Sequence, residues 1–275
     1  MFKFWFKKNF CDGWDNLFHL IVPNLVIMAS VVLGILFCIG VNSLPLSEGW
    51  KNLLSFIAIF IACGFICIFV FAEGDNCAQI ANFDSPSFKN YFAQIVPCIK
   101  DGLFFGFFLA LLGSIMYVSF PYYYRVWIPA DGSKGSLFGL VFMSVVFWFF
   151  IISILSLQWF LPIRSLMKNN FKKCFKKSYI IFFDNTWFSI VIALNNLLLT
   201  VLSVICLGLI PGISGLILAN TNALRLRLYK YDWYEVNPGM TKQQRKEIPW
   251  DELLENDKET LGPRKFKSFI FPWKM

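Results

Sequence analysis

The sequence predicts an all-α, polytopic membrane protein, with six transmembrane helices as three helical hairpins, each preceded by a cytoplasmic interfacial helix. Three observations lead to this fold class. Hydrophobic residues make up 57% of the 275 residues and charged residues only 15%, whereas charged residues are about a quarter of a typical soluble domain. The chain contains five long uncharged runs. A short basic and aromatic pattern precedes three of these runs.

The uncharged runs set the number of predicted spans. They are Leu20–Ser47, Asn52–Ala72, Gly102–Tyr124, Gly135–Ile163 and Asn185–Leu224. About 20 apolar residues cross the hydrocarbon core as a helix, so each of the first four runs predicts one span. The fifth run has about twice that length, and Pro211 followed by Gly212 in its middle favours a turn between two shorter spans. A single kinked helix, giving five spans, is the alternative.

The distribution of lysine and arginine predicts the orientation. With six spans and an inside N-terminus, Lys51, Arg125 and Lys134 are the only ones of the 25 basic residues that fall outside. Cytoplasmic segments carry such an excess of positive charge, so we expect a multi-pass protein of the cell inner membrane with both termini in the cytoplasm. The net charge of +8 then indicates attraction to anionic lipid headgroups and not to nucleic acid.

The pattern that precedes three of the runs predicts an internal repeat. Its copies are FKFWFKKNFCDGWDN from Phe2, FKNYFAQIVPCIKDG from Phe88 and FKKCFKKSYIIFFDN from Phe171. The predicted repeat units are about 1–87, 88–170 and 171–228, and together they form the six-helix transmembrane domain, residues 1–228. The alternative is that any cytoplasmic loop entering a span tends to be basic and aromatic.

An aspartate lies at the same place near the end of each copy, just before the apolar run. These residues are Asp15, Asp101 and Asp184. An aspartate at this place can accept hydrogen bonds from the free amide groups at the start of a helix and complement its dipole. We therefore expect all three to cap the ascending helices.

The third copy predicts an amphipathic helix at the membrane surface. Phe171, Phe175, Tyr179 and Phe182 share one face at helical spacing. Four lysines occupy the opposite face: Lys172, Lys173, Lys176 and Lys177. We expect these lysines to contact anionic lipid headgroups while the aromatic face lies against the apolar layer.

Residues 229–275 form the predicted polar cytoplasmic tail. Pro249 and the acidic residues beside it predict the start of a short helix. The tail ends in the basic and aromatic stretch RKFKSFIFPWKM, which predicts another surface anchor or a docking peptide.

Few residues suggest a catalytic or ligand-binding site. We predict no catalytic, cofactor-binding or metal residues and therefore no enzyme, since the chain has a single histidine and no hydrolase, protease or phosphate-binding motif. The predicted intramembrane polar contacts are Asn195, Asn196, Thr200, Asn220 and Asn222. Thr200 and Asn222 are equally far from the Pro211 turn, which predicts hydrogen bonds across the last hairpin; a polar path for a small solute is the alternative.

Small residues predict where helices approach closely. Gly102, Gly106 and Ala110 are spaced by four residues. This spacing places them on one helix face, where backbones can pack closely in lipid.

The stretches NNFKKCFKKSYIIFFDNTW and LGLIPGISGLILANTNALRLRLYK show three features in succession. These are a basic surface segment, a hydrophobic hairpin with a short break, and a final span that ends in arginine and lysine. In this pattern the chain resembles the YesL-like family of bacterial polytopic membrane proteins of unknown function. The resemblance covers residues 1–230 approximately. Because members are often encoded beside carbohydrate uptake systems, it implies an accessory role in the envelope, and it implies no catalytic residues.

Two functions are consistent with these features. The first is a non-enzymatic accessory or scaffold protein whose partners are membrane lipids and a membrane protein or transporter. The second is a small transporter or permease-like subunit with a polar path through the bundle.

Overall fold

The structure, a computed structural model, describes residues 1–130, 132, 134–241 and 243–264. These residues are helical and contain no strand, which confirms the all-α prediction. The longer helices are α1 (Phe2–Asp15), α2 (Leu17–Asn42), α3 (Glu48–Ala81), α4 (Phe88–Trp127), α5 (Leu137–Leu157), α6 (Phe160–Met167), α7 (Phe171–Asp184), α8 (Thr186–Ile205) and α9 (Gly212–Val236). The short 3-10 helix η1 (Gln244–Lys246) and helices α10 (Trp250–Leu253) and α11 (Glu255–Leu261) follow.

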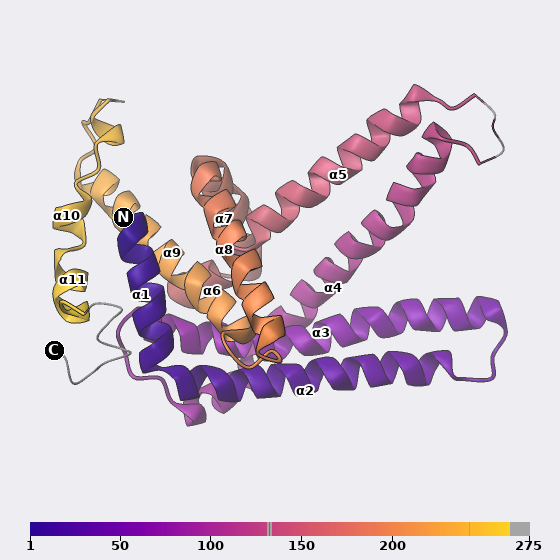
Figure 1. Cartoon of the computed structure of the whole chain (residues 1–275), viewed down its shortest axis with the longest axis horizontal. Coiled ribbons are helices and arrows are strands. Elements are labelled where there is room, and N and C mark those ends of the chain that lie inside the picture. The colour runs from indigo at the N-terminus through magenta and orange to yellow at the C-terminus, as the bar shows by residue number, and fades with distance from the viewer. Residues whose placement is uncertain (131, 133, 242, 265–275) are drawn as a thin grey trace.

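Two long hairpins, α2–α3 and α4–α5, project from a common base (Figure 1). Their turns lie at the end of the molecule away from both termini. α4 has 40 residues, so it is about 60 Å long, twice the hydrocarbon thickness of about 30 Å. If α4 crosses the membrane at an ordinary tilt of up to about 40°, part of it must therefore lie outside the apolar layer.

Glycines allow α3 and α4 to pack backbone against backbone. A Cβ atom at Gly106 would lie 2.5 Å from the Cα of Gly64, and one at Gly102 would lie 2.7 Å from the Cα of Ile68. Neither separation is possible between real carbon atoms, so both positions require glycine. The close packing predicted from this spacing is confirmed.

Five helical segments are long and apolar enough to cross a membrane within the described part of the chain: Leu17–Asn42, Glu48–Ala81, Phe88–Trp127, Leu137–Met167 and Thr186–Ile205. The sixth predicted span falls in α9, which is not among them. α9 begins at Gly212 and reaches its first charged residue at Arg225, so its uncharged part is shorter than the stretch of about 20 residues that a span needs.

Each copy of the repeated pattern begins a helix at its first residue, α1 at Phe2, α4 at Phe88 and α7 at Phe171. α1 and α7 have 14 residues each and end at the aspartate of the pattern. α4 instead continues through Asp101 to Trp127 without a break. Only two of the three copies therefore form a short helix separate from the apolar helix that follows.

The predicted helix caps are wrong at all three positions. Asn16 and Asn185 occupy the N-cap positions of α2 and α8, and neither makes a side-chain capping bond. Asp101 lies inside α4, where the backbone amides are bonded within the helix. Each carboxylate instead pairs with a cation from elsewhere in the chain: Asp15 with Arg264, Asp101 with Arg164 and Asp184 with Lys230.

The turn between α8 and α9 is bound to α2. The break predicted at Pro211 is confirmed, because α8 ends before it and α9 begins directly after it. The side-chain amide of Asn24 donates to the carbonyl oxygens of Leu209 and Pro211 at 2.9 and 3.0 Å. Its Oδ1 atom accepts the backbone N–H of Ser214 at 2.8 Å. Asn24 therefore fixes both sides of the turn.

The same turn lies at the level of the middle of α2. Gly208, with a φ of +77°, packs against Met28. From Met28 to the end of α2 at Asn42 the helix rises by about 21 Å. The α8–α9 turn is thus well short of the far end of the α2–α3 hairpin, and in Figure 1 α8 and α9 run across this hairpin rather than along it.

The N-terminal helix and the last described helices meet at the base, where α1, α10 and α11 lie together (Figure 1). Lys7 Nζ of α1 donates to the carbonyl oxygen of Gly262 at 2.8 Å. Arg225 of α9 pairs with the buried Asp257 of α11 at 3.0 Å. The boundary predicted after residue 228 lies inside α9, and the following residues fold back onto the base. The stretch RKFKSFIFPWKM, apart from Arg264, lies outside the described residues.

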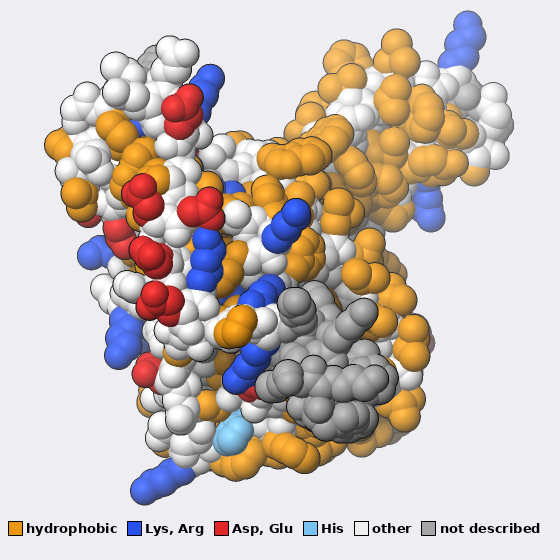
Figure 2. Space-filling view, turned by 60° about the vertical axis from the view of Figure 1, so that its left-hand side comes forward, with side chains coloured by type: hydrophobic (Ala, Val, Ile, Leu, Met, Phe, Trp, Pro, Cys, Tyr) orange, Lys and Arg blue, Asp and Glu red, His pale blue; other side chains and the backbone are white. Residues whose placement is uncertain are grey.

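Apolar and charged surfaces are segregated (Figure 2). Hydrophobic side chains cover the lobe at the upper right, apart from its tip, while acidic and basic side chains gather over the opposite side of the molecule. This distribution agrees with an integral membrane protein whose base stands in a polar environment.

Candidate anion-binding cleft

A polar cleft of about 1330 Å³ opens at the base between α3, α4, α6 and α7. Its lining combines charged groups, amides and two aromatic rings: Asp75, Ala78, Gln79, Asn82, Asp84, Gln94, Lys100, Asp101, Phe104, Arg164, Ser165, Lys168, Asn169, Asn170, Phe171, Lys172 and Lys173. The cleft brings together the predicted site residues Asp101, Lys172 and Lys173, which are far apart in the sequence.

Arg164 of α6 is fixed in the wall of this cleft. Its Nη1 and Nε atoms each lie 3.0 Å from a carboxylate oxygen, of Asp75 on α3 and Asp101 on α4 respectively. Its third nitrogen donates to Cys98 Sγ at 3.3 Å. The guanidinium is planar and rigid, so this arrangement joins three helices. Asp101 is therefore a partner of Arg164, not a helix cap.

The remaining cations of the cleft have no carboxylate partner. Lys100, Lys168, Lys172 and Lys173 form no ion pair with any described residue. Asp84 is the only lining carboxylate that is likewise unpaired within the described chain. With Arg164 neutralised by two aspartates, positive charge dominates the open part of the cleft.

Two uncharged groups in the lining also lack partners. The hydroxyl of Ser165 and the amide nitrogen of Asn169 are buried and make no hydrogen bond to described residues. Ser165 is 5% exposed. A buried polar group without a partner costs free energy. Beside them α7 begins, and its first amides have no side-chain cap, so the start of α7 presents positive partial charge at the cleft.

The aromatic face of α7 packs in part against the protein. The ring centroid of Phe171 lies 4.9 Å from that of Phe160, and the ring centroid of Phe175 lies 5.0 Å from that of Phe108. The hydroxyl of Tyr179 donates to Ser153 Oγ at 3.1 Å. Phe171, Phe175 and Tyr179 are thus half-buried against α4, α5 and α6, and contact of their remaining surface with the apolar layer stays a prediction.

The four lysines of α7 divide into two pairs. Lys172 and Lys173 line the cleft, and Lys176 and Lys177 do not. Lys176 is exposed and Lys177 partly so, with its Nζ atom 3.9 Å from Met167 Sδ.

The amides predicted to lie within the spans form specific bonds. Asn196 of α8 donates to Asn220 Oδ1 of α9 at 2.8 Å, which confirms a hydrogen bond across this hairpin. The pairing of Thr200 with Asn222 is wrong: the Thr200 hydroxyl donates to the carbonyl of Asn196 within its own helix, as threonines in helices often do. Asn195 lines a second, separate pocket.

Asn222 belongs to a buried polar cluster at the base. Its amide donates to Asn9 Oδ1 and Asp12 Oδ2, each at 2.9 Å, and Asp12 pairs with Lys8 at 2.9 Å. Burial lowers the pKa of Lys8 and raises the pKa of Asp12, because either charge loses hydration, and their attraction offsets only part of this cost. The cluster joins α1 to α9.

Metal ligands are not grouped in the described part of the chain, where no three His, Cys, Asp or Glu side chains could hold an ion together. His19 stacks on Phe88 with ring centroids 4.5 Å apart. No protein-family model, curated protein or solved structure matches the chain. The resemblance to the YesL-like family therefore stays a prediction.

Sequence reasoning missed most of the cleft. Arg164 and Lys168 were considered only as part of the positive charge that predicts the orientation. Ser165 and Asn169 were not predicted as site residues. The available signal was the clustering of Arg164, Ser165, Lys168 and Asn169 within a few residues, directly before the basic third copy of the pattern.

Proposed function

We propose that this protein is an integral inner-membrane protein whose membrane domain crosses the bilayer four times, through α2, α3, α4 and α5. Two contacts support an even number of crossings: Lys7 bonds to Gly262 and Arg225 pairs with Asp257, so the N-terminal helix and the C-terminal helices lie on one side. The position of the α8–α9 turn beside Met28 supports a hairpin that enters the membrane only part of the way.

The base faces the cytoplasm in this proposal. Among the described residues, Lys51, Arg125 and Lys134 are the basic residues near the far ends of the two long hairpins, while the other described basic residues lie in or beside the base. The excess of positive charge on cytoplasmic segments favours this orientation. The polar cleft then lies at the level of the lipid headgroups on the cytoplasmic side.

The cleft binds the phosphate of an anionic lipid headgroup. The observation that supports this most directly is the combination of unpaired donors, four lysines together with the buried Ser165 hydroxyl and Asn169 amide. Phosphate oxygens accept hydrogen bonds only and attract lysine as a point charge. Bound lipid would hold α6 and α7 at the membrane surface. We propose a non-enzymatic accessory or scaffold role, and a link to carbohydrate uptake rests on the family resemblance alone.

The test compares two double variants of the same helix in lipid nanodiscs. Each of Lys172→Gln/Lys173→Gln and Lys176→Gln/Lys177→Gln removes two charges from α7, but only the first pair lines the cleft. A hydrogen bond to a charged phosphate contributes about 1.5–3 kcal/mol, so the first variant should retain phosphatidylglycerol at least about tenfold more weakly by native mass spectrometry, and the second variant should have a smaller effect. Equal weakening by both variants would show diffuse surface attraction and contradict a specific cleft.

A further inference from the structure

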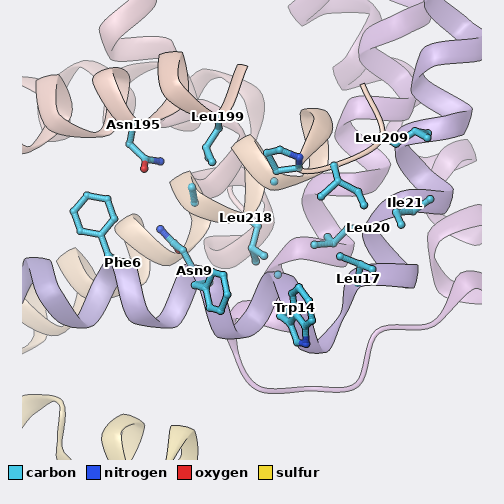
Figure 3. A pocket seen from close by; sticks show the side chains of 16 residues that line it. Phe6, Asn9, Trp14, Leu17, Leu20, Ile21, Asn195, Leu199, Leu209 and Leu218 are labelled. Atoms are coloured by element: carbon cyan, nitrogen blue, oxygen red, sulfur yellow. The ribbon is translucent and has the colours of Figure 1, made fainter. Parts of the chain in front are cut away.

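A second pocket, which shares no lining residue with the cleft, lies between α1, the start of α2, α8 and α9 (Figure 3). Its volume is about 340 Å³, at the lower end of the range for small-molecule sites. Its lining is apolar apart from two asparagines: Phe6, Asn9, Phe10, Gly13, Trp14, Leu17, Leu20, Ile21, Asn195, Leu199, Leu209, Ile210, Pro211, Gly215, Leu218 and Ala219. No charged side chain is among these described lining residues.

The two asparagines supply hydrogen-bond donors without acceptors. The Nδ2 atoms of Asn9 and Asn195 are buried and have no partner among the described residues. The Oδ1 atom of Asn9 already accepts a hydrogen bond from Asn222 at 2.9 Å, so its amide group is oriented and its N–H groups remain. Figure 3 shows both asparagines near Phe6, at the end of the pocket away from Leu209 and Ile21. One end of the pocket donates hydrogen bonds, and the rest is apolar.

We propose that this pocket binds one acyl chain of a membrane glycerolipid, with the ester carbonyl at Asn9 and Asn195. The chain matches the apolar lining, and the carbonyl is an acceptor that carries no hydrogen of its own, as two unpaired donors require. The absence of a charged side chain from the described lining disfavours a free fatty acid, whose carboxylate would be buried without a cation. The site differs from the cleft in ligand chemistry as well as in place.

The surroundings of the pocket point to the bilayer as the source of the chain. Leu194 and Leu198 of α8 flank the pocket and are 62% and 58% exposed, and Phe6 on α1 is 46% exposed. Apolar side chains so exposed beside a candidate span face lipid tails and not water. A lipid next to α8 can therefore insert a chain between α1 and α8.

Photo-crosslinking of the full chain in nanodiscs tests the proposal. The probe is a phosphatidylcholine ester with a photoactivatable group on one acyl chain, and crosslinked peptides are identified by mass spectrometry. We expect labelling at Leu199 and Leu218, which line the pocket. Leu199→Trp should abolish this labelling by filling the pocket, while Leu197→Trp, the same change at a 63% exposed residue of α8 that does not line the pocket, should leave it unchanged. Labelling confined to exposed residues of α8 would overturn the proposal.

Competition identifies the role of the two amides. An unlabelled ester lipid should displace the probe from the pocket at least about fivefold better than the matching ether lipid, since two net hydrogen bonds are lost. Asn195→Leu should remove most of this preference while labelling persists. A fatty acid that competes better than the ester, or equal competition by ester and ether lipids, would contradict the carbonyl assignment. Gel filtration and thermal unfolding of each variant establish that it is folded.

Discussion

Lys8 and Asp12 show how this protein places charge in its interior. Lys8 is 0% exposed and Asp12 5% exposed, and the ammonium group also lies 3.6 Å from the centroid of the Phe83 ring. The pair is part of the cluster that joins α1 to α9 through Asn222. A buried pair of this kind adds little net stability, but losing one partner leaves the other charge without compensation.

Replacement of Asp12 by alanine should therefore destabilise the protein by about 3–5 kcal/mol. Lys8 would remain buried without its carboxylate, and Asn222 would lose one acceptor. Unfolding in detergent, followed by circular dichroism, measures the change. Asp15→Ala is the matched control, since Asp15 is on the same helix with its side chain 44% exposed, and we expect a loss below about 1 kcal/mol there. Similar losses for both variants would contradict the importance of burial.

The helical elements were largely predictable, and their partners were not. Apolar runs gave the long helices, and Pro211 gave the break before α9, because both signals are local in the sequence. The role of Asp101 was wrong, since a carboxylate can cap a helix or pair with a cation, and Arg164 is distant in the sequence. The cleft depends on three such long-range contacts. Spacing within one segment cannot reveal them.

Close packing of α3 on α4 makes Gly106 sensitive to any side chain. A methyl group there would meet the backbone of Cys63 and Gly64 at 2.5 Å, and backbone cannot move aside cheaply. Gly106→Ala should destabilise the protein by about 1–3 kcal/mol, measured by thermal unfolding in detergent. Gly113→Ala, on the same helix with nothing within 4 Å, should be neutral or slightly stabilising, because alanine favours a helix more than glycine does. A neutral Gly106→Ala variant would contradict the packing.

At the scale of the whole molecule, the described residues contain five candidate spans where six were predicted. The distribution of lysine and arginine along the chain correctly distinguished the positively charged base from the far ends of the two long hairpins, which carry few charges. This distribution does not depend on how the helices pack. The number of crossings depends instead on where the α8–α9 turn lies. Asn24 holds that turn from α2, and an isolated asparagine in an apolar run gives no sign of its distant partners.

Labelling of Cys206 in intact cells measures the central feature of the proposed topology most directly. Cys206 is exposed at the α8–α9 turn, at the level of the middle of α2. With four crossings it lies in the hydrocarbon, so a membrane-impermeant maleimide added outside should not modify it, while Ser47→Cys in the α2–α3 turn should react fully. Detergent should then expose Cys206, as peptide mass spectrometry would show. Modification of Cys206 from outside, as fast as that at position 47, would mean that α8 and α9 cross the membrane completely and would contradict the proposal.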